Sequence, residues 1–242
     1  MTLPPVTFLR QADTHRLIPS EYHPTNQSVL LQLADGDDEV AEALRDLDGV
    51  TNDRLRSEHN QLPGINTQEL VYGVSNYQVI NAAFTHANPT GSRFNGPERG
   101  AWYAGFEFQT SLREVIHHRV EQYREIDRWD DSVTYDDYLA DFSGEFHDLR
   151  QAPAFKKYLD PNSYHESQEL AESLLDSGSS GIVYPSVRFR EGTCLVCFRP
   201  AMVNALRRAD AYRLTWNGGP EPEVDLEARA AVQRAFRNVS GV

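Results

Sequence analysis

The stretch that decides the fold reads GSRFNGPERG at residues 91–100, AWYAG at 101–105 and TSLRE at 110–114. Glycine and proline in the first segment are typical of a loop, because they favour turns over regular structure. The small and aromatic residues of the second segment favour a short strand, and the third segment begins an amphipathic helix. The stretch therefore places an arginine, a tyrosine and a glutamate on a loop, a strand and a helix that follow one another.

The rest of the chain predicts an α+β protein. Apolar residues recur at helical spacing from Leu112 to Tyr123, and a second helix is expected within residues 163–177. Residues 70–84 read as one or two strands, because they are rich in Val, Ile, Tyr and Phe. The other expected elements are strands at 138–142, 181–187, 193–198 and 212–216, and a final Ala-rich helix near 224–237. This irregular order of strands and helices favours an α+β fold over a series of βαβ units.

Residues 1–70 are expected to form an N-terminal extension packed on a domain that spans residues 71–242. Val40, Leu44 and Leu47 follow an acidic segment at helical spacing, which predicts a helix inside the extension. The sequence contains no apolar run of the length that crosses a membrane, and its start lacks the pattern of a secretory signal. We therefore expect a cytoplasmic protein without membrane contact.

The formal net charge of −13 is unfavourable for binding nucleic acid. A protein that binds nucleic acid directly needs a basic surface to neutralise phosphates, so we expect no direct binding. A small anionic ligand remains compatible with this charge, because a few arginines in a cleft can outweigh the field of the whole protein.

Cys194 and Cys197 have the spacing of a redox or metal motif, but they lie within the apolar segment TCLVCF. Residues three apart in a strand face opposite sides of the sheet, so one disulfide or metal ion could not easily bind both. A zinc site would need two further ligands, and none occurs nearby at a matching spacing. We expect two buried thiols and no metal site.

Arg93 is a candidate for binding a pyrophosphate. The neighbouring glycines allow a ligand to approach closely, and a guanidinium group can bind a pyrophosphate through two hydrogen bonds. The alternative is an ordinary surface arginine that pairs with Glu98 or another acidic residue. Arg99 is a similar but weaker candidate.

Glu114 is open to two interpretations. Ser111 and Glu114 match a capping box, in which the glutamate would only bond the start of its own helix. On the helical wheel, however, Glu114 lies about 200° from Leu112, away from the apolar stripe. A carboxylate that faces a cleft could hold a ribose hydroxyl and stabilise an oxocarbenium-like transition state.

Tyr103 and Ser186 are further candidates with ordinary alternatives. Tyr103 lies between small residues, so an aromatic ligand could stack on it, or it could be a core residue. Ser186 follows Pro185 at the end of a strand, where its hydroxyl could bond a ligand or only the local backbone. His117 and His118 are expected to be ordinary surface residues.

Taken in order, these motifs resemble those of the RES domain family, which is named for an arginine, a glutamate and a serine. The resemblance covers roughly residues 75–205 and rests on GSRFN at 91–95, WYA at 102–104, SLRE at 111–114, YPS at 184–186 and the following CLVCFRP. Many members carry a further arginine on an early strand, where this chain has Val79-Ile80-Asn81. The 70-residue extension also exceeds a minimal member of the family.

The resemblance implies a fold similar to that of ADP-ribosyltransferases, with a split, mostly antiparallel β core and surrounding helices. It implies an enzyme that consumes NAD by cleaving the nicotinamide–ribose bond, through hydrolysis or phosphorolysis, as a toxin of a bacterial toxin–antitoxin pair. One alternative is an ADP-ribosyltransferase that modifies a protein target. Another is a catalytically silent module that binds a nucleotide or a protein. The sequence defines neither the acceptor of ADP-ribose nor the oligomeric state.

The resemblance also implies a set of site residues. The catalytic residues would be Arg93, Glu114 and Ser186, and the NAD-binding residues would be Arg93, Phe94, Asn95, Tyr103 and Ser186. NAD would be a consumed substrate, and the reaction would need no metal because nicotinamide leaves as a neutral molecule. The expected partner is an antitoxin with a helix-turn-helix DNA-binding domain that covers the cleft.

Overall fold

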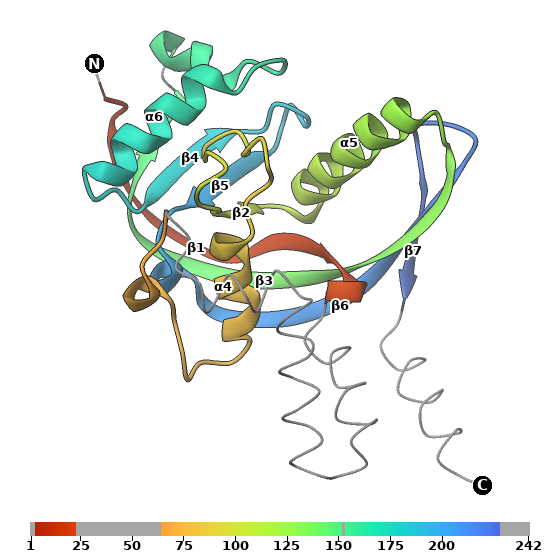
Figure 1. Cartoon of the computed structure of the whole chain (residues 1–242), viewed down its shortest axis with the longest axis horizontal. Coiled ribbons are helices and arrows are strands. Elements are labelled where there is room, and N and C mark those ends of the chain that lie inside the picture. The colour runs from red at the N-terminus through yellow and green to blue at the C-terminus, as the bar shows by residue number, and fades with distance from the viewer. Residues whose placement is uncertain (1–2, 23–63, 152, 228–242) are drawn as a thin grey trace, which may run out of the picture.

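The computed structural model describes residues 3–22, 64–151 and 153–227 (Figure 1). The strands are β1 (Val6–Pro19), β2 (Trp102–Gly105), β3 (Asp130–Asp148), β4 (Gly181–Pro185), β5 (Thr193–Cys197), β6 (Asn204–Asn217) and β7 (Glu223–Glu227). The α-helices are α4 (Tyr77–Thr85), α5 (Phe108–Ile126) and α6 (His165–Asp176), and short 3-10 helices lie at Ser20–Tyr22, Thr67–Glu69, Pro153–Leu159 and Pro200–Met202. In these described ranges no helix is long and apolar enough to cross a membrane.

Within the described residues, seven strands form one curved sheet in the order β1-β2-β5-β4-β3-β6-β7 (Figure 1). Neighbouring strands are antiparallel except β3 and β4, where the pairing of His147 with Ile182 is parallel. β1 also pairs with β3, from Val6 opposite His147 to Pro19 opposite Tyr135, so the sheet closes on itself through this pair. A mostly antiparallel sheet with surrounding helices confirms the expected α+β fold.

The helices pack on both faces of the sheet. α5 and α6 lie on one face, and α4 packs against the other (Figure 1). Ile80 and Phe84 of α4 enter the core on that side. Side chains of β5 alternate between the two faces: Cys194 packs in the core beside α6 and Cys197 in the core beside α4. Both are buried free thiols. The prediction that they face opposite sides of the sheet is therefore confirmed.

The helix α5 buries the predicted apolar stripe against the sheet. Its core partners include Leu214 and Trp216 of β6, and the buried stripe comprises Leu112, Ile116, Val120 and Tyr123. The helix begins at Phe108, and its N-cap residue is Glu107. The predicted capping box of Ser111 and Glu114 is therefore wrong, because both residues lie beyond the helix start.

The strands predicted within residues 70–84 are also wrong, because Tyr77–Thr85 forms the helix α4. Ile80 and Phe84 are four residues apart and both fully buried, as one face of a helix requires. The side-chain amide of Asn81 accepts the N–H of Val71 at 3.0 Å and donates to its carbonyl at 2.9 Å. Packing and these two bonds override the strand propensity of the β-branched residues.

The two ends of the chain contain further differences. We did not predict β1, which lies in the first 20 residues and forms a long ladder with β3. The final helix predicted near 224–237 is wrong in its first residues, which belong to β7 and pair with β6. The rest of that helix and the helix predicted around Val40–Leu47 lie outside the described residues.

Candidate active site

Side chains from several elements meet at one cavity of about 210 Å³. Three of the predicted site residues line it: Arg93 from the loop before β2, Tyr103 from β2 and Glu114 from α5. Arg16 of β1 and Tyr164, which precedes α6, add a second guanidinium group and a second phenol ring. The cavity therefore combines two cations, one carboxylate and aromatic walls.

One of the two carboxylate oxygens of Glu114 is bonded by side chains at β4 and β5. Its Oε1 accepts a hydrogen bond from the hydroxyl of Ser186 at 2.8 Å, and the thiol of Cys194 lies 3.7 Å from the same atom. Burial and the charge of Glu114 raise the pKa of Cys194, so the thiol stays protonated and can donate. The second oxygen, Oε2, has no hydrogen bond to a described residue and is open to a ligand.

Ser186 lies behind Glu114 and does not line the cavity. Its Oγ accepts the backbone N–H groups of Arg188 at 3.1 Å and Phe189 at 3.0 Å. These two amides occupy the acceptor positions of the hydroxyl, so its single hydrogen is directed to Glu114. Ser186 therefore orients the carboxylate.

The hydroxyl of Ser111 bonds two strands and does not cap its own helix. Its hydroxyl accepts the backbone N–H of Gly105 at 2.9 Å and donates to the carbonyl of His15 at 2.6 Å. The serine thus joins α5 to β2 and β1. This contact fixes the helix that carries Glu114 against the strands on either side of the cavity.

Arg93 is nearly buried, with 8% of its surface exposed, and it does not pair with Glu98. Its Nη1 donates to the carbonyl of Asp160 at 2.7 Å, and its guanidinium lies 4.8 Å from the centre of the Tyr164 ring. In the described part of the chain it has no carboxylate partner. Its charge is therefore available to an anionic ligand in the cavity.

The loop that carries Arg93 depends on Gly91. This residue has a φ of 71°, a conformation that other residues rarely adopt. A Cβ atom at this position would lie 2.3 Å from the carbonyl oxygen of Asn95, which closes the turn. The glycine noted in the sequence is thus required by the geometry of the loop.

Arg16 is a site residue that we did not predict from the sequence. Its Nη1 donates to the carbonyl of Tyr103 at 3.1 Å, and its guanidinium lies 4.8 Å from the ring of Trp102. Burial lowers the pKa of Arg16 to about 10, which still leaves it charged at neutral pH. No carboxylate among the described residues pairs with it. A single arginine in a strand has no motif around it, so only the sheet pairing reveals its place.

Tyr103, Phe94 and Asn95 are linked to one another. The hydroxyl of Tyr103 donates to Oδ1 of Asn95 at 2.8 Å and accepts the backbone N–H of Phe94 at 2.9 Å. Burial raises the pKa of this hydroxyl, so it remains protonated. Phe94 packs edge-to-face on Tyr184, with ring centres 4.8 Å apart. Neither Phe94 nor Asn95 lines the cavity, and both support the loop that carries Arg93.

The two histidines of α5 differ in position. His118 lines the cavity, although it was expected to be an ordinary surface residue, and His117 does not line it. Desolvation lowers the pKa of His118, and the carboxylate of Glu114 opposes this shift. Across the residues that the structure describes, no group of three or more His, Cys, Asp and Glu side chains is placed to hold a metal ion.

A second, larger cavity of about 480 Å³ lies between α6 and the loop at 94–100. Its lining includes the exposed carboxylates of Glu98, Glu169, Glu172 and Asp176. These charges would repel a pyrophosphate. The smaller cavity, with its two arginines, is therefore the candidate active site.

Comparisons with known proteins found a matching family and a similar solved structure. A model of the RES domain family matches residues 70–217, more than half of the chain, and this segment contains Arg93, Tyr103, Glu114 and Ser186. A solved structure of the MbcT–MbcA toxin–antitoxin complex of M. tuberculosis is similar with 15% sequence identity and a TM-score of 0.40. The similarity covers 56% of this chain and 75% of that chain. A comparison with curated proteins gave no match.

Proposed function

The chain belongs to the RES domain family, and from this premise we propose that it is an enzyme that consumes NAD⁺. The reaction is cleavage of the bond between nicotinamide and ribose, and NAD⁺ is a substrate rather than a recycled cofactor. The observation that carries the proposal is that Arg16, Arg93 and the carboxylate of Glu114 line the same cavity.

The two arginines suit the pyrophosphate of NAD⁺. A pyrophosphate that links two nucleosides carries two negative charges, and each guanidinium group can bind it through two hydrogen bonds. Arg16 and Arg93 come from different elements and are both held by backbone carbonyls, at 3.1 Å and 2.7 Å. They are therefore oriented before the ligand arrives. The sequence has no arginine at Val79-Ile80-Asn81, where the resemblance led us to compare it with the family, and we assign the role of that further arginine to Arg16 on β1.

Glu114 acts on the ribose. When the bond between C1′ of the ribose and the nicotinamide nitrogen breaks, the electron pair stays with nicotinamide and positive charge moves onto the ribose. A fixed carboxylate beside the ribose stabilises that charge more in the transition state than in the ground state. Because Ser186 and Cys194 contact Oε1, we assign Oε2 to the ribose. The oxygen of water or phosphate then bonds to C1′, and the proton that this oxygen loses passes to solvent.

The size of the cavity limits which part of NAD⁺ enters it. At about 210 Å³ it is smaller than the roughly 300–1,000 Å³ of sites that enclose a drug-sized ligand. We assign the nicotinamide end to the cavity, beside the rings of Tyr103 and Tyr164, and the adenosine end to the surface outside it. Phe94 and Asn95 then support the site from behind the loop.

The same proposal makes the chain a toxin of a bacterial toxin–antitoxin pair, with an antitoxin that covers the cavity and carries a helix-turn-helix domain. The net charge of −13 favours DNA contact through that partner rather than through this chain. We keep residue 70 as the proposed start of the segment with the family motifs; β1, which precedes it, is a strand of the same sheet and carries Arg16.

The test is to incubate the purified protein with NAD⁺, with and without phosphate, and to quantify nicotinamide, ADP-ribose and phosphorylated ADP-ribose separately. Glu114→Gln is the loss variant. Glu125→Gln is its matched control, because Glu125 is an exposed glutamate on the same helix. The proposal predicts nicotinamide release by the wild type and by Glu125→Gln, with a large loss in Glu114→Gln.

The other outcomes would identify the alternatives. ADP-ribose attached to protein, in place of free products, would favour a transferase. Bound NAD⁺ that stays intact in the wild type would favour a silent binding module and overturn the proposal.

A further inference from the structure

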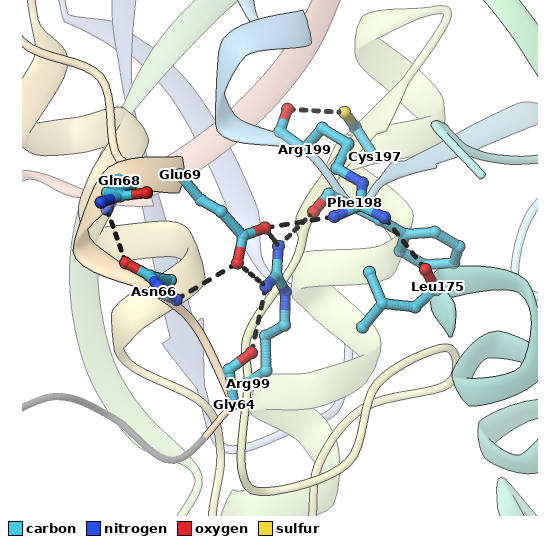
Figure 2. Close-up of polar contacts among 9 residues, drawn as sticks. All are labelled: Gly64, Asn66, Gln68, Glu69, Arg99, Leu175, Cys197, Phe198 and Arg199. Atoms are coloured by element: carbon cyan, nitrogen blue, oxygen red, sulfur yellow. Dashed lines mark hydrogen bonds and ion pairs between the residues drawn. The ribbon is translucent and has the colours of Figure 1, made fainter. Parts of the chain in front are cut away.

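An ion-pair network lies at the end of the loop that carries Arg93. The carboxylate of Glu69 accepts Nη1 and Nη2 of Arg99 at 3.0 Å and 2.9 Å, one on each oxygen (Figure 2). Nη1 of Arg199 donates to the second of these oxygens at 3.2 Å. Arg99 is only 8% exposed, whereas the side chain of Glu69 is 29% exposed, so it is the guanidinium group of the pair that is withdrawn from solvent. The carboxylate of Glu69 therefore pairs with two guanidinium groups.

The network joins segments that are far apart in the sequence. Arg99 donates to the carbonyl oxygens of Gly64 at 3.0 Å and Phe198 at 2.7 Å. Arg199 donates to the carbonyl oxygen of Leu175, near the end of α6, at 2.9 Å (Figure 2). The loop is thus tied at one point to the chain after β5 and to the last turn of α6.

A continuous series of hydrogen bonds leads from this network towards Arg93. The carbonyl of Arg99 accepts the side-chain amide of Asn95 at 2.9 Å. Oδ1 of Asn95 accepts the hydroxyl of Tyr103 at 2.8 Å, and that hydroxyl accepts the N–H of Phe94 at 2.9 Å. Phe94 directly follows Arg93, so this series fixes the backbone beside the arginine.

The first turn of α6 supports the same loop. Nε2 of Gln168 donates to the carbonyl oxygens of Ser92 at 3.0 Å and Asn95 at 3.2 Å. Because Arg199 holds the opposite end of this helix, the loop and the helix that supports it are both connected to Glu69. The same carboxylate is thus connected to the loop at two places.

We propose that Glu69 is a positioning residue for Arg93 in NAD⁺ binding, an inference that rests on the proposed function. Neither Glu69 nor Arg99 lines the smaller cavity, so an effect of Glu69 on NAD⁺ must be indirect. Removal of the carboxylate leaves two partly buried guanidinium groups without their shared counter-charge, which destabilises this arrangement. A guanidinium group that is displaced from its bidentate geometry binds a pyrophosphate less well, so the expected effect is on NAD⁺ binding.

The first experiment measures the loop in the free protein, without NAD⁺. Hydrogen exchange of the backbone amides is compared between the wild type, Glu69→Gln and Glu98→Gln. Glu98 is the matched control, because it is an exposed carboxylate next to Arg99 in the same loop. We expect faster exchange at Phe94 and Asn95 in Glu69→Gln and unchanged exchange in Glu98→Gln. Equal exchange in all three proteins would overturn the proposal, whatever the protein does to NAD⁺.

The second experiment measures nicotinamide release in the same three proteins. Glu69→Gln should raise KM about 10-fold and change kcat much less, because the catalytic carboxylate keeps its contacts. In an Arg93→Ala background, Glu69→Gln should cause no further rise in KM, since the group that it positions is gone. An additive rise, or a loss of stability with no change in KM, would overturn the positioning role.

Two further outcomes keep the tests separate. Should Glu69→Gln fail to fold, Arg199→Gln removes one link and keeps the bidentate pair, and a smaller rise in KM is expected. An unchanged KM in a folded Arg199→Gln protein would then count against the proposal. A wild type that releases no nicotinamide would refute the proposed function, and the exchange experiment alone would decide the role of Glu69 in fixing the loop.

Discussion

Replacement of Glu114 by glutamine removes one negative charge from the cavity and changes the shape of the side chain very little. The amide oxygen can still accept the hydroxyl of Ser186, which lies 2.8 Å from Oε1 in the wild type. The contacts proposed between the pyrophosphate and Arg16 and Arg93 do not involve this side chain. We therefore expect an intact fold, nearly unchanged NAD⁺ affinity and a lower turnover.

The size of the loss follows from Coulomb's law at a partly buried site. A unit positive charge about 4 Å from the carboxylate is stabilised by about 4 kcal/mol at an effective dielectric constant of about 20. The ribose carries only part of a charge in the transition state, and the amide dipole retains part of the attraction. We expect a loss of about 3 kcal/mol, similar to that for removing one oxyanion-hole donor. At about 1.4 kcal/mol per factor of ten, kcat falls about 10²-fold.

The assay is nicotinamide release at saturating NAD⁺, with Glu125→Gln as the control on the same helix. Urea unfolding of each protein shows whether the variants stay folded, and a change within about 1 kcal/mol is expected. Turnover of Glu114→Gln equal to that of the wild type would refute the assignment of the catalytic carboxylate. A fall in turnover that merely follows a loss of folded protein would refute it as well.

Arg16→Lys and Arg93→Lys should each weaken NAD⁺ binding in calorimetry about 10-fold or more, because an ammonium group cannot reproduce bidentate binding; unchanged affinity would show that neither arginine binds the pyrophosphate. Cys194→Ala should lower kcat while Cys197→Ala leaves it unchanged, because only the first thiol contacts the carboxylate of Glu114; equal kcat values in the two variants would contradict this. Burial opposes the shift, but hydrogen bonds and charge from two arginines lower the pKa of Glu69 below its ordinary value of 4.5. The stability that Glu69 contributes is then fully present above pH 4.5 and is lost as the pH falls through its folded pKa. The difference in unfolding free energy between the wild type and Glu69→Gln should therefore shrink in acid, and a constant difference would be inconsistent with the ion pair.

The parts of the site that were predictable lie close together in the sequence. Arg93, Tyr103 and Glu114 fall within 22 residues, and glycines, small residues and an apolar stripe identify their loop, strand and helix. The opposite orientation of Cys194 and Cys197 followed from strand alternation alone. Local patterns suffice where the neighbouring elements are consecutive in the chain.

The parts that were not predictable depend on contacts between distant segments. Arg16 reaches the cavity only because β1 pairs with β3 and contacts β2, and no local pattern encodes such pairing. Residues 77–85 contain β-branched and aromatic side chains that favour a strand, yet packing of α4 on the sheet makes them helical. The sequence around Ser111 matches a capping box, although the serine hydroxyl forms hydrogen bonds with backbone groups of β1 and β2 instead. In each case tertiary contacts outweigh a local preference.

The most direct test of the central claim is the amount of free nicotinamide that the purified wild-type protein releases from NAD⁺. The account predicts continuous release, matched mole for mole by ADP-ribose or phosphorylated ADP-ribose, and a loss of about 10²-fold in Glu114→Gln. NAD⁺ that remains intact beside folded wild-type protein, under conditions where calorimetry detects its binding, would contradict the claim.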